Sequence, residues 1–316
     1  MSVAALKAET ATAPVPTPCI GVCQIDERSG WCRGCGRNAD EVGAWQSAGE
    51  RYKQGVWDEL PSRRVALGLK IWRLSWSPAE IAAMIECTLR RRWGRWVLGV
   101  EGASASLAIG QDEDAEIIST PESITAVTPR GALRLLKHEK TIALAFGDAA
   151  DASGPESICL VLPRGRVKLR SGPLLICVGR DLDAIRAVDR GARLYDLGIA
   201  AELAARFCLR TDDTMLAAKL EAASGKSWRQ NRRRFRTHFA SAPAHTIVET
   251  GLGRCEIFAP PTVQTGGGAL AVLDDRAVGS PRELPAGWEI MPVFAPCALF
   301  YPDRLRPAEA FLDGPF

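Results

Sequence analysis

The apolar and polar positions in the first quarter of the chain follow the period of short helices. Asn38 is placed to cap a helix that runs to Trp45, because its side chain can accept a hydrogen bond from a free N–H of the first turn. Ser47 and Glu50 have the spacing of a capping box. The pattern therefore predicts a second helix that begins there and ends at Pro61.

Two further helices are predicted before the spacing of apolar residues changes from that of helices to that of strands. Segment 62–74 is apolar along one side. Ser77 then supplies a cap, Pro78 occupies the first helical position, and Glu80 completes a capping box. The helix that begins here carries an apolar face made of Ile81, Ile85 and Leu89.

From residue 96 onward the chain breaks into short apolar or alternating runs separated by Gly, Pro and Asp, as in strands. Residues 245–250 and 255–258 also predict a hairpin that turns at 251–253. Closely spaced strands without regular helical alternation indicate an α+β fold with a mostly antiparallel sheet. The predicted runs are 96–100, 115–118, 132–136, 141–146, 158–162 and 174–178.

Three helices are predicted among the later strands. Residues 181–187 can form one or two helical turns, and Thr211 or Asp212 can cap a helix that ends near Gly225. A basic helix over 227–240 should follow. It could bind phosphates and stack on a base, but a solvated helix face is the simpler explanation, and we expect a protein partner before a nucleic acid. Its arginines are Arg229, Arg232, Arg233, Arg234 and Arg236.

The composition is that of an ordinary globular protein. The chain has 316 residues, 47% apolar and 24% charged, which is enough for a small module and one larger domain. Its net charge of +3 does not identify a partner. The N-terminal residues lack the apolar core of a signal peptide, and no run approaches the roughly 18 apolar residues of a membrane helix. We therefore expect a soluble, cytoplasmic protein without a membrane partner.

Two close pairs of cysteines lie near the N-terminus, and each pair has a spacing that allows both sulfurs to bind one ion. Gly34 and Gly36 can adopt positive φ values that turn backbone N–H groups toward sulfur. The turn signal at 26–30 should fold the second pair back onto the first. The spacing therefore predicts one metal site formed by Cys19, Cys23, Cys32 and Cys35.

Other states of these cysteines remain open at this point. They could form two disulfides or stay as unbound thiols, although a reducing cytoplasm favours a metal. Four thiolates serve zinc and iron–sulfur clusters equally well, so the spacing does not choose between an iron–sulfur cluster and Zn²⁺.

The N-terminal segment also carries a spaced pattern of matching positions: Pro18-Cys19-Ile20-Gly21-Val22-Cys23, Asp26, Gly30, Cys32, Gly34-Cys35-Gly36-Arg37, Glu41, Trp45, Leu60-Pro61 and Arg63-Arg64. Over residues 17–64 this pattern resembles the domain of unknown function 1289 family, whose members are labelled predicted iron–sulfur proteins. The resemblance implies a four-cysteine site and supplies no reaction.

A second set of positions lies in the larger part of the chain: Trp96, Leu98-Gly99, Gly102-Ala103, Asp189-Arg190-Gly191-Ala192, Leu194-Tyr195-Asp196-Leu197-Gly198, Leu252-Gly253-Arg254, Glu256-Ile257, Pro285 and Gly287-Trp288. Residues 77–305 thereby resemble the domain of unknown function 6925 family, which can follow the cysteine module in one polypeptide.

The larger part contains no recognised catalytic motif. Residues 224–227 end like a phosphate loop, but the required first glycine would fall at Leu220, inside a helix. Asp189, Arg190 and Asp196 are the best polar group, and an Asp–Arg pair that orders a loop explains them without a substrate. Neither metal spacing nor a neighbouring nucleophile accompanies the histidines, which are His138, His238 and His245.

The sequence thus predicts a disordered lead over 1–17, a four-cysteine helical module over 18–76 and an α+β domain over 77–316. The predicted function is metal binding, with an iron–sulfur cluster in an electron-transfer, sensory or structural accessory role. The alternative is an interaction module with a structural zinc and a basic helix for a protein or nucleic-acid partner. We do not expect the chain to be an enzyme on its own.

Overall fold

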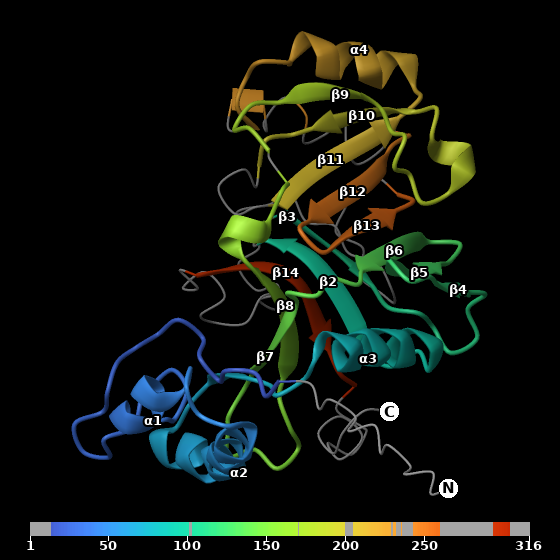
Figure 1. Ribbon diagram of the computed structural model, residues 1–316. Helices are drawn as coiled ribbons and strands as arrows, with labels where there is room; N and C mark the ends of the chain where they lie inside the picture. Colours follow the sequence, from blue (N-terminus) through green and yellow to red (C-terminus); the bar gives the residue numbers. More distant parts are fainter. Residues whose placement is uncertain are drawn as a thin grey trace, which may run out of the picture.

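The computed structural model describes residues 14–100, 103–169, 171–199, 205–228, 230–231, 235, 243–259 and 293–303 (Figure 1). Within these ranges the chain forms two antiparallel sheets and a few short helices. The predicted α+β class with a mostly antiparallel sheet is therefore confirmed. Most of the predicted lead lies outside the described residues, and the domain division at residue 76 stays a prediction.

The cap predicted at Asn38 and the capping box predicted at Ser77 are both present, and Asn38 also forms a full capping box. α1 (Ala39–Ala44) and α3 (Pro78–Arg90) each begin with a side chain that accepts from the backbone N–H three residues later, and the acid at that later position accepts in return. These reciprocal bonds satisfy N–H groups that have no partner inside the helix. The pairs are Asn38 with Glu41 for α1 and Ser77 with Glu80 for α3.

Helix α2 (Glu50–Leu67) differs from its prediction at both ends. No side chain caps its first turn, so the capping box expected at Ser47 is wrong. The helix also passes through Pro61, where it was expected to stop. Its buried face continues on both sides of the proline, from Leu60 to Arg64, and this packing offsets the roughly 3 kcal/mol that an interior proline costs.

The helix predicted over 62–74 is wrong beyond Leu67. Gly68 takes a left-handed conformation with φ +61° and ends α2. The chain then enters β1 (Ile71–Arg73), which pairs with β7 (Ile142–Phe146). The segment after α2 is therefore the edge strand of a sheet otherwise built from later parts of the chain.

Every strand pairing in the two sheets is antiparallel. The six-stranded sheet has the order β1-β7-β8-β14-β2-β3, and the eight-stranded sheet has the order β4-β5-β6-β13-β12-β11-β10-β9. The remaining bounds are β2 Arg95–Val100, β3 Ala103–Leu107, β4 Glu116–Ser119, β5 Ser123–Val127, β6 Gly131–Leu136, β8 Ser157–Pro163, β9 Ile176–Arg180, β10 Arg193–Asp196, β11 Ala205–Thr211, β12 His245–Thr250, β13 Gly253–Ile257 and β14 Phe294–Tyr301.

All six predicted runs overlap strands, and the predicted hairpin is the β12–β13 pair. Besides β1, strands β3, β5, β10, β11 and β14 were not predicted. β3 has only small residues before Leu107, so its alternation of Ala and Ser gives a weak hydrophobic signal although every residue is buried. β11 includes Arg206 and Arg210, which made the segment look polar.

The later helices also required correction. Residues 181–187 form no α-helix, and only a short 3₁₀ turn, η2 (Ala187–Asp189), follows. α4 (Thr214–Ala222) is capped by Asp213, whose Oδ1 accepts from Leu216 N, because Thr211 still belongs to β11. The basic helix over 227–240 lies mostly outside the described residues, as do Arg229, Arg232, Arg233, Arg234 and Arg236.

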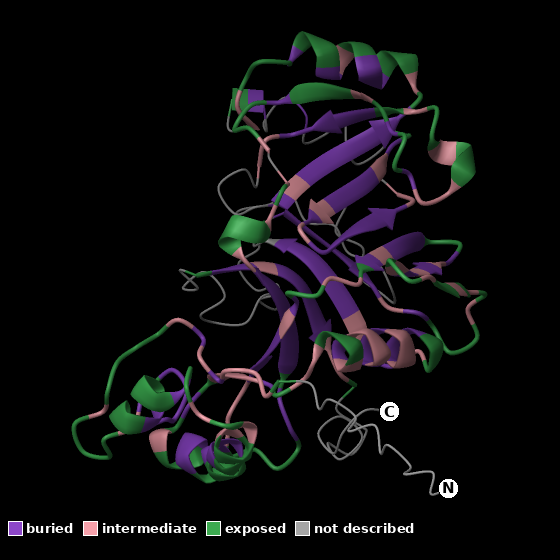
Figure 2. Cartoon of the chain, in the orientation of Figure 1, coloured by how far each residue is buried: buried purple, intermediate pink, exposed green. Residues whose placement is uncertain are grey.

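The core lies where the two sheets face each other. Strands β2 and β3 of the six-stranded sheet contact β12 and β13 of the other, and their buried side chains form one continuous cluster. Figure 2 shows the buried strands in the middle and the largely exposed α4 at the periphery. Helix α3 buries its predicted apolar face beside β4, β5 and β7. No helix in the described ranges is both long and apolar enough to cross a bilayer.

Removing the cap of α3 should destabilise the protein measurably. In Ser77→Ala the N–H of Glu80 loses its acceptor, so the free energy of unfolding in urea should fall by about 1 kcal/mol. Ser62→Ala is the matched control, because that exposed hydroxyl bonds only the Glu59 carbonyl within α2. Equal losses in the two variants would contradict the role of the cap.

Candidate metal centre

A short hairpin carries the four cysteines that were predicted to bind metal. Ile25 and Cys32 form an antiparallel bridge, and Asp26 N donates to Trp31 O at 2.8 Å. The turn predicted over 26–30 is thus confirmed, and it brings the second cysteine pair back toward the first.

The side chain of Asp26 fixes this turn. Its Oδ2 accepts from Ser29 N at 3.0 Å and from Ser29 Oγ at 2.8 Å, while Oδ1 accepts from Arg33 Nη2 at 2.7 Å. The hydrogen bond from Arg33, followed by those from Ser29, lowers the pKa of Asp26 to about 2. The carboxylate is therefore ionised at neutral pH and holds the two arms of the hairpin together.

Two glycines allow the second cysteine pair to lie close to the first arm. A Cβ at Gly34 would lie 2.2 Å from the Val22 carbonyl oxygen, so this glycine is required for space rather than for a positive φ. Gly36 has φ +81°, as predicted, and its N–H donates to Cys32 O at 2.7 Å.

The four thiols differ in exposure. Cys32 and Cys35 are buried, Cys19 is half-buried and Cys23 is exposed. The neighbouring Cys19, then burial and Cys32, raise the pKa of the Cys23 thiol, and burial raises that of Cys35. All ten cysteines of the chain lie in described ranges and are free, so the disulfide alternative is not supported.

The hairpin does not present a finished metal site. Among the described residues, no group of three or more His, Cys, Asp or Glu side chains is arranged so that it could hold an ion. The four-cysteine knuckle is therefore not confirmed, and the ligand assignment stays a prediction for Cys19, Cys23, Cys32 and Cys35.

Three arginines stack on tryptophans around the hairpin, at 4.7 to 5.5 Å from the ring centroids: Arg37 on Trp45, Arg63 on Trp31 and Arg64 on Trp57. Arg37 Nε also donates to Cys35 Sγ at 3.5 Å. Arg63 is neutralised by Glu41, whose two carboxylate oxygens lie 2.7 and 3.0 Å from its Nη atoms.

Arg64 and a fourth arginine, Arg73 on β1, have no acidic partner within the described residues. The Nε atom of each is buried without a hydrogen-bond acceptor. Burial lowers the pKa of both to about 10, while Cys35 opposes this shift at Arg64 and Cys19 opposes it at Arg73. Because a buried cation without a counter-charge is costly, these residues fit a negatively charged group at the thiols. No sequence pattern marked Arg73 as a site residue.

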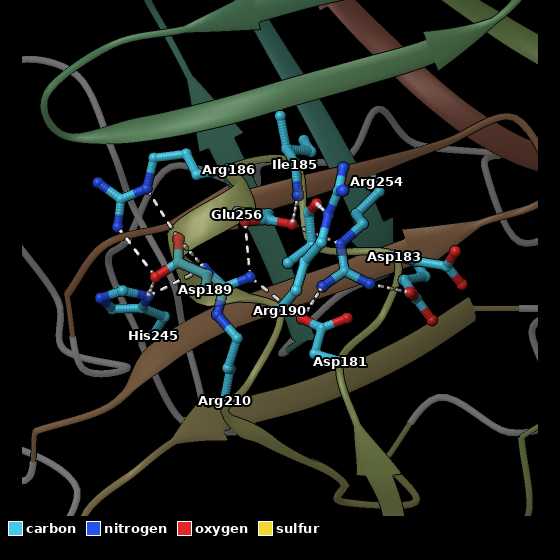
Figure 3. Close-up of polar contacts among 12 residues, drawn as sticks. Asp181, Asp183, Ile185, Arg186, Asp189, Arg190, Arg210, His245, Arg254 and Glu256 are labelled. Carbon is cyan, nitrogen blue, oxygen red and sulfur yellow. Dashed lines mark hydrogen bonds and ion pairs between the residues drawn. The ribbon is translucent and has the colours of Figure 1, made fainter.

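A second charged cluster lies on the eight-stranded sheet beneath segment 181–192 (Figure 3). Arg210 Nη1 on β11 lies 3.0 Å from Asp181 Oδ2 and 2.8 Å from Glu256 Oε2. Arg254 Nε on β13 lies 2.6 Å from Glu256 Oε1, and its Nη2 contacts Asp181. The side chains of Arg210 and Glu256 are only 1% and 0% exposed. The buried charges of this cluster are thus paired with one another.

The predicted group of Asp189, Arg190 and Asp196 does not form one site. Asp189 Oδ2 lies 2.7 Å from Arg186 Nε and 3.0 Å from Arg210 Nη2, so an Asp–Arg pairing does order the loop, with other arginines than expected. Arg190 Nε donates to a backbone carbonyl at 3.3 Å. Asp196 lies on β10 and makes separate contacts.

The histidines take no part in a metal group among the residues that the structure covers. His245 Nδ1 lies 3.0 Å from Arg210 Nη2, and burial, followed by Arg210, lowers the pKa of His245. The neutral ring therefore borders the charged cluster at pH 7. His138 Nδ1 accepts from Lys140 N at 3.0 Å, and His238 lies outside the described residues.

Comparison with known proteins confirms both resemblances. The family model described as "Family of unknown function (DUF6925)" matches residues 80–310, which is more than half of the chain. The chain belongs to this family. The model described as "Protein of unknown function (DUF1289)" matches residues 17–64. A cysteine-rich N-terminus in that second family is consistent with a metal-binding module.

The curated relatives match only a short part of the chain. "Uncharacterized protein YdhL" from Escherichia coli strain K12 and from Shigella flexneri is 51% identical over 43 residues, which is 14% of this chain and 53% of YdhL. The chain thus spans about half the length of the curated relatives it matches. No solved structure matches the chain.

Neutralising one acid of the charged cluster should destabilise the large domain strongly. Glu256→Gln leaves Arg210 and Arg254 short of a buried counter-charge, so we expect a loss of about 3 kcal/mol in urea denaturation. Lys70→Gln, which breaks the exposed contact with Asp148, should cost much less, because solvent screens an exposed ion pair. Similar values for both variants would show that the buried network contributes no more than a surface pair.

Proposed function

We propose that the N-terminal hairpin binds one metal centre through Cys19, Cys23, Cys32 and Cys35, and that the occupant is an iron–sulfur cluster. The observation that carries this proposal is a pair of arginines, buried Arg64 and half-buried Arg73, whose Nε atoms are buried without an acceptor and which lack an acidic partner in the described part of the chain. Four thiolates around a metal leave a net negative charge, and this charge would serve as the counter-charge that Arg64 and Arg73 lack.

Hydrogen bonding at the hairpin supports the same proposal. Gly21 N lies 3.3 Å from Cys19 Sγ and Arg37 Nε lies 3.5 Å from Cys35 Sγ, so donors already point at one sulfur of each pair. Donors of this kind stabilise thiolates and tune a bound centre. The hairpin would need to close further to bring all four sulfurs to one centre.

An accessory role in electron transfer or sensing suits the exposure of the hairpin. Cys23 is exposed, which leaves one side of the centre open to a redox partner, while Cys32 and Cys35 are shielded. An iron–sulfur cluster here would supply reversible one-electron chemistry. The choice of iron–sulfur over zinc rests on the label of the family that the hairpin resembles.

A structural zinc within an interaction module is the second candidate. It is favoured by exposed apolar side chains on and beside the hairpin, among them Ile25, Tyr52 and Val65. Such a module would hold a protein partner and need no redox chemistry. The nucleic-acid version of this candidate depends on arginines that lie outside the described residues.

Metal analysis of the whole chain tests the proposal. Protein purified without oxygen should contain iron and acid-labile sulfide and absorb visible light. Cys23→Ser should lose most of the iron, because it removes one of the four proposed thiolate ligands. Since Cys23 is exposed, the substitution should leave the core undisturbed. Cys177→Ser is the matched control, since that cysteine is also exposed but lies on β9.

Three results would count against parts of this proposal. Zinc without sulfide or colour would replace the cluster by the structural zinc. Chains that hold neither metal would reject both candidates. Equal metal loss in Cys23→Ser and Cys177→Ser would reject the assigned ligands.

A further inference from the structure

Segment 181–192 is held on the eight-stranded sheet mainly by charged side chains. Its acids point inward: the side chains of Asp181 and Asp189 are 1% and 12% exposed, and each has a carboxylate oxygen 3.0 Å from Arg210. Its apolar side chains Leu182 and Val188, in contrast, are 72% and 84% exposed and add little buried apolar area. The position of the segment therefore depends on the charges beneath it.

His245 lies at the border of this charged cluster, in a place that requires a neutral ring (Figure 3). It stands directly opposite Arg210 in the pairing of β12 with β11, and its Nδ1 lies 3.0 Å from Arg210 Nη2. A guanidinium group can only donate, so Nδ1 must accept through its lone pair and the ring proton must lie on Nε2. Protonation of Nδ1 would remove this hydrogen bond and place two positive charges side by side.

A carboxylate of segment 181–192 lies within reach of the same ring nitrogen. Asp189 Oδ1 is 3.9 Å from His245 Nδ1, while Asp189 Oδ2 is bound by Arg186 at 2.7 Å and by Arg210 at 3.0 Å. Although burial opposes it, hydrogen bonding from Arg186 and the charge of Arg210 lower the pKa of Asp189, so the carboxylate stays ionised in mildly acid solution. A protonated His245 would compete with Arg210 for this carboxylate. The charge of His245 thus selects between two partners for Asp189.

The charged groups that face His245 in the described part of the chain come from three elements: Arg210 from β11, Arg186 and Asp189 from segment 181–192, and Glu256 from β13. Burial, followed by Arg210, lowers the pKa of His245, and Asp189 opposes this shift. Because the folded pKa lies below the unfolded value of 6.5, the neutral ring stabilises the fold fully above that value. This contribution is lost as the pH falls through the folded pKa.

We propose that His245 is a pH-sensitive switch for segment 181–192. While the ring is neutral, Arg210 holds Asp189 and the segment lies on the sheet. Once the ring is protonated, Asp189 turns to His245, and residues 185–192 loosen. The beginning of the segment stays in place, because Asp181 is bound by Arg254 as well as by Arg210. The switch is independent of the metal centre.

Hydrogen exchange at about pH 7.5 and 5.0, corrected for the effect of pH on the exchange reaction itself, tests the switch. In the wild type, protection in residues 185–192 should fall roughly 10-fold at the lower pH, as expected for the loss of one hydrogen bond to a charged group. The amides of Ile185, Asp189 and Ala192 report on this, because each donates to a group of the segment or of the cluster. The paired strands β5 and β6 should not change.

Two variants separate His245 from other titrating groups. His245→Gln should keep the same protection at both pH values, because a neutral amide oxygen can accept from Arg210 at either pH. His138→Gln is the matched control, since that ring bonds Lys140 N outside the cluster, and it should lose protection as the wild type does. In the wild type, the ring of His245 followed by NMR should titrate below 6.5, with the same midpoint as the change in exchange.

Three results would overturn the switch. Wild-type protection in residues 185–192 that is equal at both pH values would show that the segment does not respond to the ring. The same loss in His245→Gln as in the wild type would assign the response to another group. If His245→Gln is already unprotected at pH 7.5, the wild type decides alone, and midpoints of ring titration and exchange that differ would separate the two events.

Discussion

A buried guanidinium group is stable only beside a negative charge, and this constraint applies at two places, the eight-stranded sheet and the N-terminal hairpin. On the eight-stranded sheet, Arg210 and Arg254 meet it with carboxylates from β13 and from the covering loop. Near the N-terminal hairpin, the Nε atoms of Arg64 and Arg73 are buried without an acceptor, and neither arginine has an acidic partner among the described residues. The charges of the first cluster are thus paired within the chain, whereas these two cations are not paired within its described part.

The fold makes this hairpin part of the larger structure. Strand β1 is donated to the edge of the six-stranded sheet immediately after α2, and Ile20 reaches the same sheet from the other side of the cysteine loop. The N-terminal segment is therefore anchored to the sheet at two points. Arg73, the last residue of β1, therefore belongs to the sheet as well as to the segment that leads from the hairpin.

Local chemistry accounts for the features that the sequence predicted well. Asn38 and Ser77 cap their helices because only neighbouring residues are involved, and Gly36 adopts the positive φ expected just after Cys35. The β12–β13 hairpin follows from its turn residues in the same way. These elements depend on contacts a few positions apart, so their signals are complete in a short stretch of sequence.

The features that were missed depend on distant partners. The sequence of β11 appeared polar because it contains Arg210. The acidic partners of Arg210, Asp181 and Glu256, lie 29 and 46 residues away and come close only in the folded chain. α2 passes Pro61 because tertiary packing outweighs a local preference. Arg73 was not predicted as a site residue for the same reason, because its neighbours in the sequence do not resemble metal ligands.

X-ray absorption at the metal edge of the anaerobically purified chain tests the central claim most directly. The account predicts an iron edge with a first shell made of sulfur alone at about 2.3 Å, from four cysteine thiolates and the sulfide of a cluster. A first shell of nitrogen or oxygen, or a chain without bound metal, would contradict it.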